Sequence, residues 1–117
     1  MKPRIKRVYD APEASDGKRI LVDRLWPRGL TKEEAAVDVW LKDVAPSTEL
    51  RRWYHGGNGS WTEFRKRYVA ELDENPEAVS RLREDLRGKA TLVYGSKDPD
   101  HNHARALVEY LEAETDT

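Results

Sequence analysis

The chain of 117 residues is long enough for one domain with a single core and too short for two. Its 21 Lys and Arg nearly balance its 22 Asp and Glu, so no overall field attracts nucleic acid or anionic lipid, and any anion site must be local. Because the chain has no cysteine, disulfides, thiolate nucleophiles and sulfur-ligated metals are excluded. Four Trp and five Tyr predict a folded chain despite the mean hydropathy of −0.89.

The N-terminal part predicts two strands, a short helix and a third strand. Residues 5–9 (IKRVY) and 19–23 (RILVD) have strand composition, and the turn-rich stretch between them would allow the two to pair. Thr31 and Glu34 form a capping box, in which each side chain satisfies the other residue's backbone N–H, so a short helix begins at Thr31. Residues 37–41 begin with apolar and polar residues in alternation, as in a strand with one buried face.

Two helices are predicted next. Ser47 is placed to cap a short helix over residues 48–54. Ser60 and Glu63 form a second capping box before a helix over residues 61–75. Its apolar stripe consists of Trp61, Phe64, Tyr68 and Leu72.

The C-terminal part predicts helix, strand and helix. Asn75 as cap, Pro76 at the first helical position and Gly88 after the last turn bound one helix. Residues 90–95 (ATLVYG) are apolar, β-branched and aromatic, which indicates a central strand. A last helix follows, with an apolar face. The order of elements predicts an α/β fold: a single three-layer domain over residues 1–117 with a small, at least partly parallel sheet flanked by helices.

Two starting points of the last helix are compatible with the sequence. If Asp98 caps it and Pro99 begins it, His101 lies near its apolar side and is a candidate for the cleft described below. If Asn102 is the cap, the direction of His101 changes. In either case His101 and His103, two residues apart, point in different directions and cannot chelate one metal together.

Several stretches together resemble one known family. They are VYDAPEASDGKRILVDRLWPRGLTKEEA, WLKDVAPSTELRRWYH and TLVYGSKDPDHNHARALVEYL, in which the DRLWPRG, KDxAPS and HNxA blocks are specific in combination. On these blocks the chain resembles the YeaO-like group of the domain-of-unknown-function family 488 (DUF488) over nearly its whole length. The resemblance implies a compact α/β fold without an established reaction.

Cationic side chains follow three of the predicted strands. Arg24, Trp26 and Arg28 come after residues 19–23; Lys42, with Arg51 beyond it, comes after residues 37–41; Lys97 comes after residues 90–95. If the strands are parallel, their carboxyl ends meet at one edge of the sheet, where open α/β folds bind ligands. We therefore expect Arg24, Arg28 and Lys97 to converge on one anion, with Arg51 as a weaker fourth ligand and a helix N-terminus adding backbone donors.

A structural role is the alternative for each of these residues. Arg24 or Arg28 could form an ion pair with Asp23 or Asp43 and hold a loop in place. The tryptophans are expected in the core or against loops rather than as platforms for a ligand, because aromatic side chains dominate core energetics.

No strong catalytic motif is present, and the weak catalytic candidates are Asp98 and His101. Burial and the neighbouring Lys97 would push the pKa of Asp98 in opposite directions, which would allow acid–base chemistry. No spacing suits a metal or a cofactor, so none is expected. The N-terminal stretch has no apolar run that would act as a signal peptide or membrane span, and a cytoplasmic location is the default expectation.

Two functions of different classes follow from this pattern. The first is an enzyme or binding protein for an anionic small molecule, phosphate-bearing or nucleotide-like. The second is a non-enzymatic protein-interaction domain, whose Trp and Arg side chains would act as hot spots on an exposed surface. Nucleic acid is a weaker third candidate, because basic residues are not segregated from acidic ones. A concave cluster of cations would favour the first function, and a flat patch the second.

Overall fold

The strands of the described residues all belong to one parallel sheet. The computed structural model describes residues 3–57, 59–98 and 100–115. The sheet consists of β1 (Arg4–Arg7), β2 (Lys18–Leu21), β3 (Val39–Trp40) and β4 (Ala90–Tyr94). Their order is β1-β4-β2-β3, and each pair of neighbours is parallel. The predicted α/β class is thus confirmed, and so is the parallel orientation on which the site prediction depends.

The strand β4 lies inside the sheet, as its apolar sequence predicts. Leu92 is the register partner of both Ile5 in β1 and Ile20 in β2, and it is fully buried. The suggested pairing of residues 5–9 with 19–23 is therefore wrong, because β4 lies between the two strands. The short connection between β1 and β2 would allow a hairpin. The structure instead places β4, the most apolar strand, between them, where it is covered on both faces and paired at both edges.

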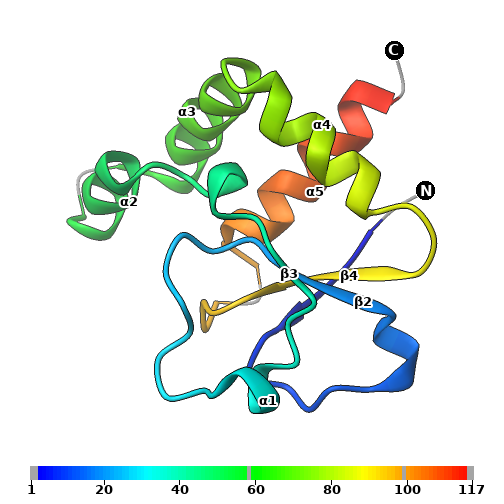
Figure 1. Cartoon of the computed structure of the whole chain (residues 1–117). Helices are drawn as coiled ribbons and strands as arrows, with labels where there is room; N and C mark the ends of the chain where they lie inside the picture. The colour runs from blue at the N-terminus through cyan, green and yellow to red at the C-terminus, as the bar shows by residue number, and fades with distance from the viewer. Residues whose placement is uncertain (1–2, 58, 99, 116–117) are drawn as a thin grey trace.

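Five α-helices and two 3-10 turns complete the described part of the chain. The α-helices are α1 (Lys32–Ala35), α2 (Thr48–His55), α3 (Trp61–Asp73), α4 (Pro76–Asp85) and α5 (His103–Thr115), and the 3-10 turns are η1 (Ala14–Asp16) and η2 (Lys42–Val44). Figure 1 shows α3, α4 and α5 on one side of the sheet and α1 on the other. Among the described residues, no helix has the length and the apolar run that crossing a bilayer requires.

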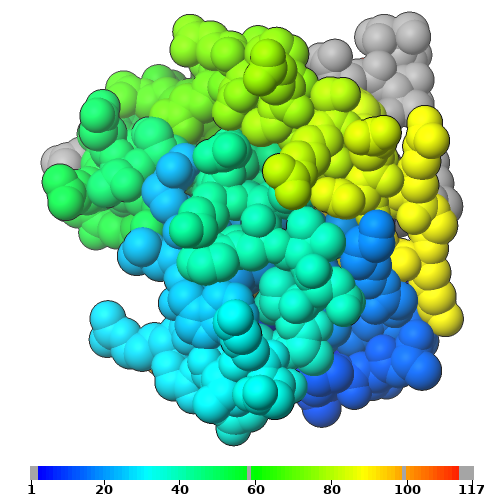
Figure 2. Space-filling view, in the orientation of Figure 1, coloured from blue at the N-terminus to red at the C-terminus, as the bar shows by residue number. Residues whose placement is uncertain are grey.

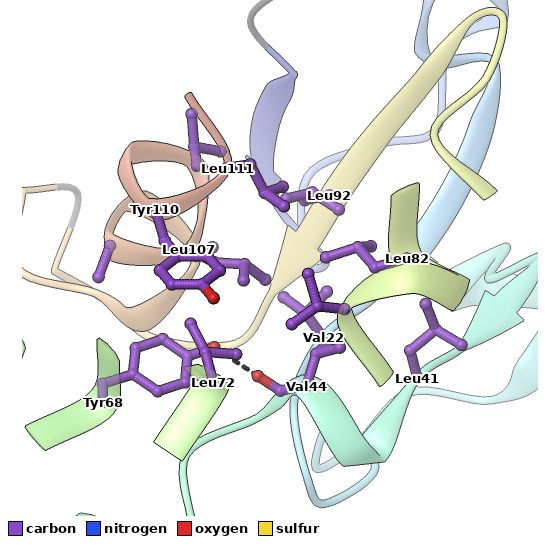
Figure 3. Packing of buried hydrophobic residues seen from close by; sticks show 14 of the residues in the cluster. Val22, Leu41, Val44, Tyr68, Leu72, Leu82, Leu92, Leu107, Tyr110 and Leu111 are labelled. Carbon is purple, nitrogen blue, oxygen red and sulfur yellow. Dashed lines mark hydrogen bonds between the residues drawn. The ribbon is translucent and has the colours of Figure 1, made fainter. Parts of the chain in front are cut away.

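The main core fills the space between the sheet and the helices α2 to α5. Ile20 and Leu92 from the strands pack with Leu82 from α4 and Leu107 from α5, and all four are fully buried. Figure 3 labels Leu82, Leu92 and Leu107 among their neighbours from the other elements. The apolar stripe of α3 that the sequence predicts faces this core through Phe64, Tyr68 and Leu72.

A second, smaller cluster covers the opposite face of the sheet. Leu21 and Val93 alternate with the residues of the main core along their strands and point to this side, where Ala35 of α1 meets them. Trp26 and Trp40 pack here edge to face, with ring centroids 5.4 Å apart. The predicted third layer therefore consists of a one-turn helix and the segment that follows β2, rather than of long helices.

The helix caps agree in part with their predictions. Thr31 and Glu34 form the expected capping box, and the hydroxyl of Ser47 accepts the backbone N–H of Leu50. Ser60 caps α3 in the same way, whereas the Glu63 carboxylate forms an ion pair with Arg67.

The start of α4 differs in its side-chain contact. Asn75 occupies the cap position and Pro76 the first turn, as predicted. The Asn75 amide, however, donates to the carbonyl of Asp43 and not to its own helix. It therefore ties the start of α4 to η2, which follows β3.

Replacing Tyr68 with phenylalanine is expected to lower the free energy of unfolding by about 1 to 2 kcal/mol, because it leaves a carbonyl in the core without its partner. The Tyr68 hydroxyl donates to the carbonyl of Val44 inside the main core (Figure 3). Burial raises the pKa of Tyr68, so the hydroxyl keeps its proton. Urea denaturation measures the loss. Tyr9→Phe is the control, since the Tyr9 hydroxyl donates to the backbone carbonyl of Arg28 at the exposed surface. Equal losses of stability in both variants would contradict the role of burial.

Candidate functional site

The carboxyl ends of β2 and β4 meet at one edge of the sheet, because the two strands are parallel neighbours. From there the chain leaves in two directions: the segment after β2 leads to α1 on one face, and the segment after β4 leads to α5 on the other (Figure 1). Open α/β sheets bind ligands in the crevice that such a divergence creates. Topology alone therefore marks this edge as the candidate site.

A cleft of about 450 Å³ opens at this edge. Its walls are Arg24 and Leu25 after β2, Pro46 before α2, the α2 residues Arg51 and His55, and the segment 95–97 after β4. In Figure 2, part of the blue segment that follows β2 lies against the green residues of α2 and of the loop before it. The cleft thus joins segments that lie far apart in the sequence.

Three cations and one carboxylate line the cleft. The cations are Arg24, Arg51 and Lys97, and the carboxylate is Asp23. Within the part of the chain that the structure describes, none of the three cations forms an ion pair with a carboxylate. A second hollow, of about 350 Å³ between β1 and α5, contrasts with this, since Arg4 and Arg105 are accompanied there by Glu109 and Glu112. The cleft therefore carries an excess of positive charge.

Arg24 has a structural contact as well as its place in the wall. Its Nε donates to the carbonyl of Pro46 at 3.2 Å, and its Nη2 donates to that of Ala45 at 3.1 Å. These bonds hold the loop before α2 against the segment after β2. The ion pair with Asp23 or Asp43 that the sequence offers as the structural alternative for Arg24 or Arg28 is not among the ion pairs of the described residues.

Asp23 and His103 form a polar pair within the cleft. One carboxylate oxygen of Asp23 accepts the backbone N–H of Gly95 at 2.9 Å, which ties the ends of β2 and β4 together. The other lies 2.9 Å from Nε2 of His103, and the same nitrogen lies 3.1 Å from the carbonyl of Val22. A carbonyl can only accept, so Nε2 carries the hydrogen that it shares with Val22, while the Asp23 oxygen beside it has no hydrogen-bond partner among the described residues. Nδ1 is the nitrogen left for other partners.

Three residues that the sequence assigns to the anion site lie outside the cleft lining. The indole N–H of Trp26 donates to the carbonyl of Leu30 at 2.8 Å, within the smaller core cluster. Arg28 is exposed, and its carbonyl accepts the hydroxyl of Tyr9. Lys42 lies over the ring of Trp40, 4.2 Å from the centroid. Of the six predicted ligand-binding residues, the structure brings Arg24, Arg51 and Lys97 together.

The last helix begins at the later of the two possible positions. Asn102 is buried, and its side-chain oxygen accepts the backbone N–H of Arg105, so Asn102 caps α5. Asp98 instead accepts the backbone N–H groups of Asp100 and His101 in the preceding turn. These two hydrogen bonds hold the pKa of Asp98 below its usual value. Asp98 is therefore a carboxylate acceptor at neutral pH.

His101 lies beside the cleft, against aromatic rings. Its imidazole stacks on Trp61 with centroids 5.1 Å apart and planes inclined by 16°. Both rings border a small recess of about 50 Å³ that shares Arg51, His55 and His103 with the cleft. Among the described residues, no group of three or more His, Asp or Glu side chains is placed to hold a metal ion.

Comparison with known proteins decides the family. A family model described as "Inactive DUF488-N3 subclade" matches residues 2–117. The chain belongs to the DUF488 family. The uncharacterized protein YeaO of Escherichia coli is 47% identical over 107 residues, which cover 91% of this chain and 93% of YeaO. The uncharacterized protein Rv3073c of Mycobacterium tuberculosis is 42% identical over 110 residues, or 92% of each chain. No solved structure matches the chain.

Asp23 and His103 meet in the cleft of this DUF488 protein but are not among the predicted ligand residues; His55 and Ser96, which also line the cleft, are not among them either. The sequence pairs Asp23 only with an arginine, although its place at the end of a predicted strand is a signal for a site residue. From the sequence, His101 and not His103 is the candidate for the cleft. Its position becomes clear once Asn102 is taken as the cap of α5, because His103 is then the first helical residue and lies next to the end of β2.

Proposed function

We propose that this DUF488 protein binds a small, phosphate-bearing anion in the cleft at the carboxyl ends of β2 and β4. The observation that carries the proposal is the excess of cationic over anionic side chains in a concave site, with no carboxylate paired to those cations among the described residues. Cationic side chains that share a concave site without carboxylate partners repel one another, and an anionic ligand relieves this repulsion.

The three cations differ in what they offer a phosphate. Arg51 and Lys97 supply a guanidinium fork and an ammonium group, and Arg guanidinium matches two phosphate oxygens at once. Two hydrogen bonds to backbone carbonyls fix the guanidinium of Arg24. Among the described residues its Nη1 forms no hydrogen bond, so this nitrogen is the one that can donate to a phosphate. We assign Arg51 and Lys97 to affinity, and Arg24 both to affinity and to the shape of the cleft.

We further propose binding without catalysis. The matching family model is described as an inactive subclade, which supports this choice. The two weak catalytic candidates support it as well: Asp98 is engaged by backbone N–H groups, and His101 stacks on Trp61 at the surface. Neither lies among the residues that line the cleft.

An interaction domain is less well supported. It would need exposed tryptophans on a flat patch, but all four tryptophans are partly buried. Trp26 and Trp40 pack on each other, Arg67 covers Trp53, and Trp61 stacks between Phe64 and His101. These contacts fit structural roles, and the cations lie in a concavity.

Replacing Arg51 with alanine is expected to weaken phosphate binding about tenfold or more, because a charge-assisted hydrogen bond contributes roughly 1.5 to 3 kcal/mol. Lys97→Ala should have a similar effect. Stability without the anion should change little, since neither side chain is in the core. Isothermal titration with inorganic phosphate measures the affinity, and thermal denaturation measures the stability.

Two matched variants serve as controls. Arg52 neighbours Arg51 on α2 but is exposed and does not line the cleft, so Arg52→Ala should bind phosphate like the wild type. The sequence predicts Arg28 as a ligand of the anion, but Arg28 does not line the cleft, so Arg28→Ala should also bind phosphate like the wild type. A phosphate affinity that falls equally in Arg51→Ala and Arg52→Ala would indicate a general charge effect and contradict the proposal.

A further inference from the structure

Three aromatic rings form a continuous stack beside the cleft. Phe64 lies in the core, Trp61 stacks on it with centroids 5.3 Å apart and planes at 17°, and His101 stacks on Trp61 in turn. We call these three residues the ring stack. His101 is exposed and forms its outer end. Planar rings favour offset stacking of this kind, and an exposed last ring can accept one more.

The ring stack and the cationic cleft are neighbours. Arg51, His55, Ser96 and His103 line both the cleft and the recess under the ring stack. His101 is four residues beyond Lys97 in the same segment after β4. The recess itself, about 50 Å³, is too small to enclose a heterocyclic base. A planar ring would therefore lie against the outer face of His101.

We propose that the anion is a mononucleotide, whose phosphate binds Arg51 and Lys97 and whose base extends the ring stack on His101. This inference rests on the proposed function, since it assumes that the cleft takes a phosphate. It adds that the phosphate belongs to a molecule with a planar heteroaromatic ring. Stacking on an aromatic side chain accepts every base, so the inference concerns the class of ligand and not one base.

The charge distribution favours a single nucleotide over a nucleic acid strand. A strand-binding surface needs a positive groove that follows several phosphates. Here the cations gather in one cleft, and the chain as a whole has a net charge of −1. The site has the charge for one phosphate group rather than for a row of them.

The test compares adenosine monophosphate with its two halves, ribose phosphate and adenosine, by isothermal titration. For the wild type we expect adenosine monophosphate to bind about tenfold more tightly than ribose phosphate, because base stacking on an aromatic side chain is favourable. His101→Ala should remove this difference and leave the affinity for ribose phosphate unchanged. His101→Phe should retain it, because the variant keeps a planar ring. His101 is exposed, so both variants should fold.

The outcomes separate the two proposals. If ribose phosphate and adenosine monophosphate bind the wild type equally, the ring inference is overturned and the anion site stands. If none of the phosphates binds, the proposed function itself fails. If a single-stranded oligonucleotide binds far more tightly than adenosine monophosphate, a strand is the ligand and the mononucleotide inference is overturned. If His101→Ala lowers the affinity for ribose phosphate as much as that for the nucleotide, His101 does not act through stacking.

Discussion

Replacing Asp16 with alanine is expected to lower the free energy of unfolding by about 3 to 5 kcal/mol, because it leaves a buried cation without its partner. Asp16 is fully buried, and Arg19 is 2% exposed. A carboxylate oxygen of Asp16 lies 2.8 Å from Nη1 of Arg19, and Lys6 lies 3.2 Å from both carboxylate oxygens. Since a domain of this size is stable by roughly 5 to 15 kcal/mol, the variant would be close to unfolding.

The remaining contacts explain why this ion pair cannot rearrange. Arg19 also donates to the carbonyls of Ala35 and Val8, so its guanidinium is held at both ends. Asp16 accepts the backbone N–H of Glu13 and thereby closes η1. The network joins β2 to α1 and to the end of β1, and loss of Asp16 would loosen all three.

The control for this prediction is an ion pair of the same length at the surface. Arg65 and Glu109 lie 2.8 Å apart, with side chains 42% and 46% exposed. Exposed pairs contribute about 0.2 to 1 kcal/mol, so Glu109→Ala should unfold almost like the wild type. Guanidinium denaturation of both variants measures the difference. Comparable losses would mean that burial of the Asp16 pair does not determine its contribution.

The stability of the protein at acid pH should depend on the same network of Asp16, Arg19 and Lys6. Burial raises the pKa of Asp16, but hydrogen bonds from the Glu13 backbone, Arg19 and Lys6 outweigh it and hold the pKa at about 2, against 3.8 for a free carboxyl. A lowered pKa contributes stability that is complete above the unfolded value and is lost as the pH falls toward the folded one. The wild type should therefore lose stability between about pH 4 and pH 2. Asp16→Asn should lack this component of the acid transition.

Replacing Gly17 with alanine is expected to lower the free energy of unfolding by roughly 2 to 4 kcal/mol, since strain in the backbone and a clash with the main chain act together. Gly17 has φ of 63° and ψ of −139°, a region that only glycine adopts readily. A Cβ built there would lie 2.3 Å from the carbonyl oxygen of Lys89. That oxygen accepts the N–H of Lys18 at the start of β2, so it cannot move away without breaking the ladder.

Gly29→Ala isolates the contribution of the backbone angle. Gly29 has φ of 83°, but a Cβ there would meet no atom within 4 Å. Its cost should be only about 1 kcal/mol, the value for a non-glycine residue in the left-handed region. Thermal denaturation of both variants gives the comparison. If Gly29→Ala is as destabilised as Gly17→Ala, the close approach of Lys89 is not the cause.

Local signals in the sequence predict the elements of the fold but not their arrangement. The capping box at Thr31 and Glu34 and the apolar strand at residues 90–95 are each decided by neighbouring residues, and both are present in the structure. Strand order is different, because the insertion of β4 between β1 and β2 depends on residues that are more than 70 positions apart. The buried pair of Asp16 and Arg19 is hidden for the same reason. In the sequence it is part of a polar turn, and only the assembled fold buries it.

The sequence predicts where the cleft lies but only some of the residues that line it. Parallel strands bring the segments after β2 and β4 to one edge, as expected from the positions of Arg24 and Lys97. The path of this loop depends on contacts with distant segments, such as those of Arg24 with the carbonyls of Ala45 and Pro46, which the local pattern does not reveal. Within DRLWPRG, Arg24 lines the cleft, whereas Trp26 packs in the smaller core cluster and Arg28 lies at the surface.

If phosphate binds between the ends of β2 and β4, an NMR titration with inorganic phosphate will locate it there. With ¹⁵N-labelled protein, the backbone N–H signals of Leu25, Gly95, Ser96 and Lys97 should shift together and saturate, while those of Arg4 and Val108 beside the second hollow should not move. Chloride at equal ionic strength should leave the cleft signals in place. Shifts spread over the whole surface, or shifts that chloride reproduces, would contradict an anion site in the cleft.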